Sequence, residues 1–184
     1  TANATTSVGN VTIFAGVGTL KAANYDFTAV DGTLSITKAQ LSANGSKVYD
    51  GLITINGNQL TISGVNGETF TATGSATMGT KNVQTNEALA SLAGLTLTGA
   101  NGSNLGNYEL LALANTSVSV TPLAITLVAP NATKVYDGTA LRETTSTDLI
   151  ALSSQLVGGD RVSAAEIVYG DKDVGTSKRV TLNS

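Results

Sequence analysis

The side chains best suited to chemistry lie in one pentapeptide, Lys-Val-Tyr-Asp-Gly, which occurs at 47–51 and again at 134–138. Its carboxylate suggests a calcium site between modules, yet calcium requires several clustered oxygens and the chain contains no D-x-D-x-D run. The simpler interpretation is a turn in which the carboxylate accepts hydrogen bonds from nearby backbone amides. The expected turn residues are Asp50 with Gly51 and Asp137 with Gly138.

The lysine of this pentapeptide recurs in a chain where charged residues are scarce, and an Asn-Tyr pair recurs as well. One hypothesis is an isopeptide cross-link between such a lysine and one of these asparagines, assisted by a neighbouring acid. The alternative is an exposed lysine whose aliphatic stem packs along a strand. The residues concerned are Lys47, Lys134, Asn24 and Asn107.

Aromatic residues make up only 4% of the chain, so the placement of its tyrosines is informative. Four of the five occupy equivalent positions, two in the pentapeptide and two after the recurring asparagine. A tyrosine ring supplies buried area that Ala and Val cannot, while its hydroxyl reaches a polar partner. We therefore expect each to anchor a core or a junction between modules, and ligand stacking is the alternative. The tyrosines are Tyr25, Tyr49, Tyr108, Tyr136 and Tyr169.

The composition excludes several classes of function. The chain of 184 residues contains neither Cys nor His, so disulfides, zinc fingers and Cys- or His-dependent catalysis are impossible, and we expect neither enzyme activity nor a cofactor. The net charge of −3 includes no basic run, which argues against nucleic acid as a partner. No apolar stretch is long enough to cross a bilayer and no signal-like segment follows Thr1, so we expect no membrane insertion and interpret the chain as an excised fragment.

Apolar and polar residues alternate along many short segments, as in half-buried β-strands. Asp-Gly and Asn-Gly pairs predict tight turns, and 86–93 is the best helical candidate, with Gly94 placed to end it. Expected strands include residues 11–17, 33–37, 53–55, 60–62, 69–73 (with Phe70 and Ala72 inward), 95–98, 117–121 and 125–127. Expected turns are at 31–32, 56–57, 66–67 and 101–102.

Landmarks recur at a nearly constant interval along the chain. Lys47 and Lys134 are 87 residues apart, Tyr25 and Tyr108 are 83 apart, Ile36 and Val120 are 84 apart, and 81–85 matches 172–176 at a spacing of 91. Small differences in spacing fit loops of unequal length between copies of one module. The sequence therefore predicts the end of one copy at 1–38, a complete copy at 39–122 and the start of another at 123–184. A division into 1–94 and 95–184 is the alternative.

The chain resembles the YDG and related mostly-β, glycine-rich (MBG-type) repeats of large bacterial surface proteins. The resemblance lies in K-V-Y-D-G at 47–51, G-N-Y at 106–108, and strands that end in I-T-K-A at 36–39 and V-T-P at 120–122. The chain departs from the family pattern where Leu123 follows V-T-P, and its last copy has no N-Y segment. The resemblance implies stalk material of filamentous-haemagglutinin-like adhesins of Gram-negative bacteria, exported to the cell surface.

We expect an all-β fold of antiparallel sandwich-like modules joined end to end in an elongated rod; a β-solenoid is the alternative. The expected role is a non-catalytic stalk that projects a distal binding region from the cell. Its partners would be neighbouring repeats of the same chain, and host or community surface ligands would bind through other domains. The alternative is that the repeat itself binds a glycan, ice or a host surface protein. Threonine rows at 69–73 and 96–98 suggest ice, and the scarcity of aromatic residues argues against glycans.

Overall fold

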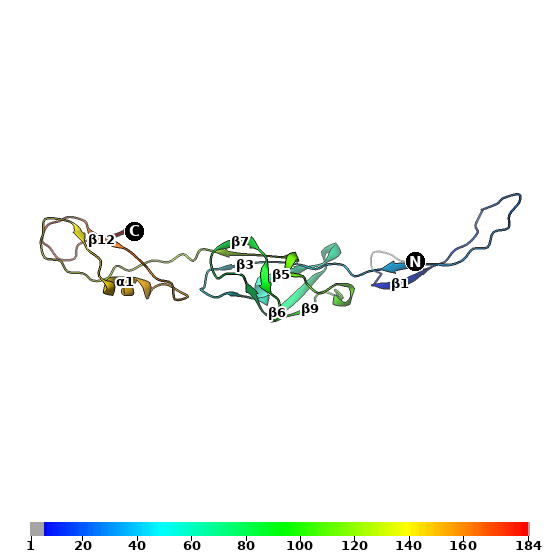
Figure 1. Cartoon of the computed structure of the whole chain (residues 1–184), viewed down its shortest axis with the longest axis horizontal. Helices are drawn as coiled ribbons and strands as arrows, with labels where there is room; N and C mark the ends of the chain where they lie inside the picture. The colour runs from blue at the N-terminus through cyan, green and yellow to red at the C-terminus, as the bar shows by residue number, and fades with distance from the viewer. Residues whose placement is uncertain (1–5, 184) are drawn as a thin grey trace. The chain divides into compact units, whose positions relative to one another are not determined.

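The computed structural model describes residues 6–183, which belong to two compact units (Figure 1). The first five residues of the predicted segment 1–38, and Ser184 at the end of 123–184, lie outside the described residues. The first unit consists of Thr1–Ser46, Thr54–Gly79 and Asn86–Ser119, and the second of Lys47–Ile53, Thr80–Thr85 and Val120–Ser184.

The first unit begins with a two-stranded antiparallel hairpin of β1 (Gly9–Ile13) and β2 (Gly32–Ile36), in which Gly9 pairs with Ile36. The alternation of apolar and polar residues predicted both strands. The turn predicted at 31–32 is wrong, because Gly32 is already the first residue of β2 and a long loop joins the strands. Within that loop the Asp31 carboxylate accepts a hydrogen bond from the Ala15 amide at 3.0 Å.

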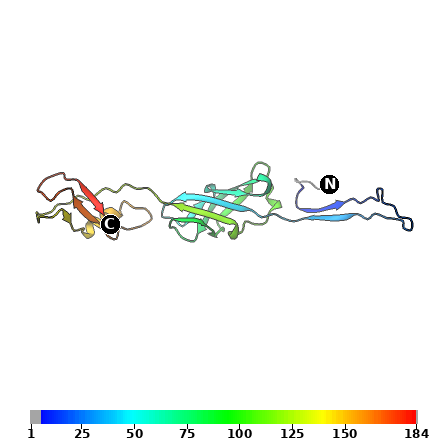
Figure 2. The same ribbon diagram turned by 90° about the horizontal axis from the view of Figure 1, so that it is seen from above.

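An eight-stranded sheet forms the centre of the chain, with the order β4-β6-β5-β3-β10-β7 and with β8 and β9 also paired to β6. In Figure 2 the neighbours β3 (cyan) and β10 (light green) lie side by side. The strands are β3 (Ser42–Val48), β4 (Thr54–Asn56), β5 (Leu60–Ser63), β6 (Thr69–Met78), β7 (Gln84–Glu87), β8 (Leu89–Ser91), β9 (Leu95–Gly99) and β10 (Thr116–Thr121).

The core of this sheet follows from the alternation of β6, the longest strand. Phe70 and Ala72 point inward as predicted and are buried, and the ring of Phe70 meets that of Tyr108 edge to face at 5.1 Å. Small and branched side chains fill the remaining space. The other buried apolar residues of the sheet and its loops are Leu41, Ala43, Ile55, Leu60, Ile62, Ala76, Met78, Leu89, Val118 and Val120.

Two of the Asn-Gly pairs form the expected left-handed turns, and one does not. Asn66 and Gly67 have φ values of 54° and 78° and join β5 to β6, and the pair at 101–102 is also left-handed. The turn predicted at 56–57 is wrong, because the Gln59 side chain accepts from the Asn56 amide at 3.0 Å and starts a 3₁₀ turn instead. The 3₁₀ turns are η1 (Gly57–Gln59), η2 (Val65–Gly67), η3 (Leu105–Asn107) and η4 (Leu113–Asn115).

The helix predicted at 86–93 is wrong, since this stretch contains the end of β7 and all of β8. Asn86 has a φ of 53°, which no right-handed helix accepts. The Leu89 amide donates to the Thr116 hydroxyl at 2.8 Å, so contacts distant in sequence override the local preference.

The α-helix lies instead at α1 (Ser146–Ser153). Asp148 and Thr145 form a reciprocal cap at its start, with the Thr145 amide 2.8 Å from the Asp148 carboxylate. This helix belongs to the second unit and buries Leu152.

The second unit also contains a three-stranded antiparallel sheet in the order β11 (Leu141–Arg142), β12 (Glu166–Tyr169) and β13 (Val180–Asn183). Ile167 of β12 is fully buried. The strand predicted at 125–127 is wrong, because this segment has no strand partner in the structure.

The pairing of β11 with β12 repeats that of β4 with β6. Ile55 faces Ala76 in the earlier pair, and Arg142 faces Ile167 in the later one. These positions are related by the spacings of 87 and 91 found in the sequence. The two ladders therefore have the same register in both copies.

The pairing of β12 with β13 repeats that of β6 with β8 at one position, and a bulge shifts the register of β6 and β8 at the next pair, where Thr77 faces Ser91. Met78 faces Leu89, and Tyr169 faces Val180, both at a spacing of 91. We refer to 39–122 as the complete copy and to 123–184 as the partial copy, using the boundaries predicted from the sequence.

The fold is mostly β, with 37% of the residues in strands and 11% in helices. The described residues form several open sheets, and none is a solenoid, so the solenoid alternative is wrong.

Candidate functional site

The first pentapeptide forms a turn that its own lysine closes. The side chain of Lys47 is only 1% exposed, and its Nζ donates to the Asp50 carboxylate at 2.6 Å and to the Leu52 carbonyl at 2.9 Å. The Asp50 carboxylate also accepts from the Leu52 amide at 2.9 Å. Gly51 has a φ of 76°, a conformation that glycine adopts at no steric cost.

The second pentapeptide forms the same turn. Lys134 Nζ lies 2.7 Å from the Asp137 carboxylate and donates to the Thr139 carbonyl at 2.9 Å. The Thr139 amide donates to Asp137 at 2.9 Å, and Gly138 has a φ of 80°. The turn interpretation of Asp-Gly is thus confirmed in both copies.

The lysine was missed as part of this turn. The expectation of an exposed lysine stem is wrong for Lys47, because burial excludes water from its amine and the turn supplies the hydrogen-bond acceptors in its place. The signal was available in the sequence as the i, i+3 spacing of Lys and Asp.

The lysines also set the acidity of the two aspartates. The hydrogen bond from Lys134, followed by that from the Thr139 amide, lowers the pKa of Asp137 to about 2. The hydrogen bond from Lys47 lowers the pKa of Asp50 in the same direction. A carboxylate held in its charged form by a neighbouring lysine is a weak proton acceptor, which suits a structural role better than general-base chemistry.

The recurring Asn-Tyr pair belongs to the first unit and makes contacts of its own there. The Asn107 side chain accepts from the Val8 amide at 3.1 Å, and its carbonyl accepts from the Ala39 amide at 3.0 Å. Asn24 precedes Tyr25, whose backbone bridges to Ala22. Both lysines and Asn107, which the isopeptide hypothesis would join covalently, are therefore engaged in noncovalent contacts.

The tyrosines differ in burial: Tyr108 is buried, Tyr49 and Tyr169 are half-buried, and Tyr25 and Tyr136 are exposed. Tyr108 is 3% exposed; its hydroxyl donates to the Glu68 carboxylate and accepts from the Val65 amide at 3.0 Å. Desolvation and the bond to Glu68 raise its pKa. The anchor interpretation fits Tyr108 and is wrong as an interior role for Tyr25 and Tyr136, which are 74% and 58% exposed.

Tyr49 is half-buried and takes part in a polar cluster of the second unit. Its hydroxyl donates to Asp160 at 2.5 Å, and Lys81 donates to the other oxygen of the same carboxylate at 2.7 Å. The Lys81 amine also lies 5.8 Å from the centre of the Tyr49 ring. The hydrogen bond from Lys81, then that from Tyr49, lowers the pKa of Asp160.

Sequence reasoning missed the acids that hold these hydroxyls. Glu68 receives the hydroxyl of Tyr108, and Asp160 receives that of Tyr49. A Val-x-Gly-acid pattern occurs at 65–68 and again at 157–160, and this recurrence was the signal that could have found them.

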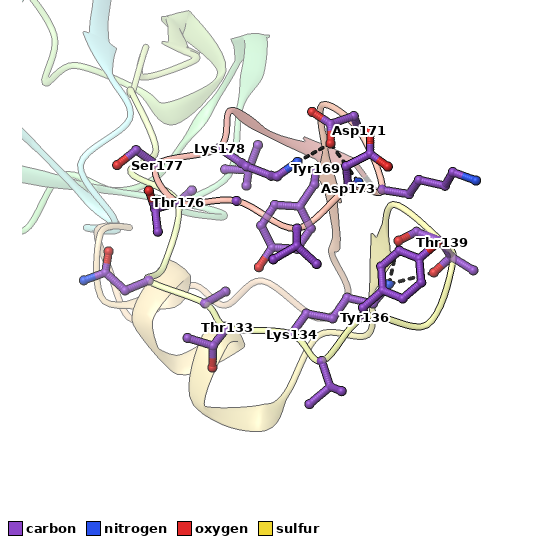
Figure 3. Close-up of a pocket in the computed structure, with 18 of the residues that line it drawn as sticks. Thr133, Lys134, Tyr136, Thr139, Tyr169, Asp171, Asp173, Thr176, Ser177 and Lys178 are labelled. Carbon is purple, nitrogen blue, oxygen red and sulfur yellow. Dashed lines mark hydrogen bonds and ion pairs between the residues drawn. The ribbon is translucent and has the colours of Figure 1, made fainter.

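The second unit contains a cavity of about 610 Å³, shown in Figure 3. One wall is the segment 129–136, which includes Lys134 and Tyr136, and another is 171–178. The ring of Tyr169, from β12, is drawn between these walls in Figure 3. The second wall is stabilised by an ion pair of Lys178 with Asp171, which lowers the pKa of Asp171.

The described residues contain no group of three or more His, Cys, Asp or Glu side chains that could hold a metal ion. Within the same residues, no helix has the length and apolar character required to cross a membrane.

Comparison with known families identifies the repeat. The profile of the YDG domain matches residues 31–117 and 121–184, which together make up most of the chain. Comparisons with curated proteins and with solved structures found no match.

Proposed function

Because the chain belongs to the YDG domain family, we propose that it is a non-catalytic structural module of a large bacterial surface adhesin. Tandem copies would act as a stalk that projects a distal binding region from the cell, and the protein would be exported to the cell surface. The observation that carries this proposal is the recurrence of one turn and of the register between β4 and β6 in two stretches of the same chain. Repetition of a module is how elongated proteins gain length.

The contacts of the pentapeptide support the non-catalytic part of the proposal. Its amine and its carboxylate bond to each other and to the backbone of their own turn. Side chains used in this way stabilise local structure and are not directed at a substrate.

The pairing of β6 supports a sandwich-like module. Its first half pairs with β5 and β9, and its second half pairs with β4 and β8. A strand that changes partners along its length can serve two layers of one sandwich. We propose that such modules follow one another end to end, with neighbouring repeats of the same chain as their partners.

The spacer role is tested by the number of copies. In a series of chains with increasing numbers of the 39–122 segment, the maximum dimension from small-angle X-ray scattering should increase by a constant increment per copy. A maximum dimension that stays nearly constant, as in a compact assembly, would contradict the proposal.

Adhesion by the full adhesin provides a second test. Exchange of one copy for an unrelated β-sandwich domain of equal length should preserve adhesion, because a spacer contributes distance and not contacts. Loss of adhesion in this chimera, with surface display unchanged, would show that the repeat itself contacts the ligand.

The alternative function is direct binding of a glycan, ice or a host surface protein, and the cavity of Figure 3 is the observation that favours it. Two tyrosines and the carboxylates of Asp171 and Asp173 line this cavity, and rings beside carboxylates are suited to sugars. A glycan array and an ice-recrystallisation assay on this chain test the alternative. Binding that is lost in Tyr136→Ala would support it.

A further inference from the structure

A cluster of contacts in the second unit joins residues from both copies of the repeat. Tyr49, Gly51 and Lys81 lie in the first stretch matched by the YDG profile, and the loop 155–160 lies in the second stretch. All of these residues belong to the same compact unit. The cluster therefore shows how the complete copy meets the partial copy along this chain.

The polar part of the cluster has its donors on the complete copy and its acceptors on the partial one. The Tyr49 hydroxyl and the Lys81 amine each bond one oxygen of the Asp160 carboxylate, at 2.5 and 2.7 Å. The same amine donates to the Gly158 carbonyl at 3.0 Å. Hydrogen bonds to a charged group are stronger than neutral ones, so this loop is bound through both its side chain and its backbone.

The backbones of the two copies also touch, at a pair of glycines. A Cβ on Gly51 would lie 2.2 Å from the Cα of Gly158, and a Cβ on Gly158 would lie 2.5 Å from the Cα of Gly51 and 3.3 Å from the Tyr49 hydroxyl. No side chain fits at either position. An exposed ion pair alone contributes little to stability, whereas this close approach adds a requirement of shape.

The next glycine of the loop separates the demands of conformation from those of space. Gly158 and Gly159 both have left-handed backbones, with φ values of 65° and 75°. A Cβ on Gly159 would meet no atom within 4 Å. Gly158 is therefore required by its conformation and by its contact, and Gly159 by its conformation alone.

Hydrogen bonds within the partial copy hold the loop in place. The Asp160 amide donates to the Val157 carbonyl at 3.2 Å, which closes the turn that carries the carboxylate. The Gln155 side chain accepts from the Val128 amide at 2.7 Å and donates to the Val128 carbonyl at 3.0 Å. The loop is thus attached to the segment that leads out of the complete copy.

Apolar side chains beside the polar cluster extend the contact. A groove of about 400 Å³ is lined by Val83 of the complete copy and by Leu123, Ile125 and Val157 of the partial copy. Tyr49 and Asp160 line the same groove. The contact therefore combines charge, shape and apolar surface at one place.

A loop of the same Val-x-Gly-acid pattern lies at 65–68 and binds a different tyrosine. Its acid, Glu68, receives the hydroxyl of Tyr108. This loop has Asn66 at the position of Gly158, and a Cβ at that position would collide with the glycine of the turn. The two loops are thus not interchangeable at the contact between copies.

We propose that the turn at 47–51, together with Lys81, is a docking surface that recognises the loop 157–160 of the following repeat. The inference deepens the spacer proposal and rests on it in one respect, since the partner is a neighbouring repeat of the same chain. Because the donors are on one copy and the acceptors on the next, the contact has a direction. Consecutive repeats are then joined by a defined contact in addition to the covalent linker.

A water-soluble carbodiimide tests the contact in the intact chain. The reagent activates a carboxyl group, a paired amine attacks the carboxyl carbon, and an amide forms while the oxygen leaves as part of a urea. Lys81 and Asp160 are accessible to it, with side chains 35% and 40% exposed. Peptide mass spectrometry should find these two residues joined in molecules that keep the 18.5 kDa mass of one chain.

The ion pair of Lys178 with Asp171 provides an internal control, because both residues belong to the partial copy. Its amide should form at the same yield in the parent chain and in every variant. The yield of the Lys81–Asp160 amide is therefore expressed relative to that of Lys178–Asp171.

Gly158→Ala and Gly159→Ala form the matched pair of variants. Gly158→Ala should lower the relative yield by more than about fivefold, because its methyl group overpacks the contact with Gly51. Gly159→Ala adds the same group to the next left-handed glycine without a contact, and it should retain most of the yield.

Two results would overturn the proposal: no Lys81–Asp160 amide in a sample where Lys178–Asp171 is joined, or equal losses in Gly158→Ala and Gly159→Ala. The spacer role is judged separately, from the increment in maximum dimension per copy. A constant increment without the amide would reject the docking surface alone, and the amide without an increment would reject the spacer role alone.

Discussion

The complete and partial copies begin with the same turn, yet only one of them forms a sheet around it. Lys47 and Lys134 each close a turn with their own Asp and the carbonyl five residues on. The ladder of β4 with β6 also has the same register as that of β11 with β12. In the complete copy, however, the lysine lies on β3, which pairs with β5 and β10, whereas Lys134 lies on a segment with no strand partner.

This difference shows which parts of the repeat are locally determined. The turn and the short antiparallel ladders form from residues close in sequence, so they appear in both copies. Pairing of β3 with β10 joins residues about seventy positions apart, and β3 pairs with β5 as well. The turn and the short ladders are thus the local part of the repeat, and the pairing of β3 with β10 is a long-range part.

The largest expected effect tests the difference in burial between two tyrosines that occupy equivalent positions in the repeat. Tyr108→Ala should lower the free energy of unfolding by about 4 kcal/mol, because it removes a ring packed against Phe70. The matched change Tyr25→Ala, at a ring that is 74% exposed, should cost less than about 0.5 kcal/mol. Urea unfolding followed by circular dichroism measures both values. Equal losses would contradict the difference in packing.

The next effect compares the two lysines. Lys47→Met should cost about 2 kcal/mol, because it removes the amine that donates to the Leu52 carbonyl and to the Asp50 carboxylate and leaves Asp50 with the Leu52 amide. Lys134→Met should cost less, since its side chain is 16% exposed and water can replace the lost bonds. Hydrogen exchange of the amides in each turn resolves the two copies within one molecule. Faster exchange after Lys134→Met than after Lys47→Met would reverse this ranking.

A pH effect should appear at the cap of α1, where the partial copy differs from the complete one. Hydrogen bonds from Thr145 and then Arg142 lower the pKa of Asp148 to about 2, against about 3.9 in an unfolded chain. The folded-state pKa is depressed, so this stabilisation is present above pH 4 and is lost as pH falls toward 2. The helical signal near 222 nm should weaken over this range. Asp148→Asn should reduce that dependence, and an unchanged pH profile would exclude Asp148 as its source.

The smallest expected effect concerns the left-handed glycines. Gly138→Ala should cost about 1 kcal/mol from backbone strain alone, because a Cβ there meets no atom within 4 Å. Gly51→Ala should cost more, since its Cβ would lie 2.2 Å from the Cα of Gly158 within the second unit. Thermal unfolding of both variants measures the comparison. Identical melting temperatures would show that Gly51 and Gly158 do not touch in solution.

Much of the sheet could be predicted from the sequence because alternation is a local signal. It located β6 and its inward residues, and Asn66-Gly67 identified the hairpin from β5 to β6. It did not identify α1, whose start is marked by the Thr145 and Asp148 cap and not by a strong apolar period. The stretch at 86–93 looked helical because the contact of Leu89 with Thr116 is invisible to local reasoning.

The candidate site was predictable only in part. The recurrence of Lys-Val-Tyr-Asp-Gly identified both turns, since the Asp-Gly geometry is local. The sequence places Tyr108 and Tyr25 at equivalent positions of the repeat, and this equivalence could not predict their different burial. Burial depends on which strands surround each tyrosine.

The neighbouring positions of β3 and β10 have a mechanical consequence. One lies near the start of the complete copy and the other near its end, and the bond from Tyr49 to Thr121 brings their last residues together. The chain therefore enters the strand pair at one end and leaves it at the other. Tension along the chain would load the bonds between these strands in shear, so that they must break together and not one after another. A module with this geometry is expected to resist being pulled open under flow.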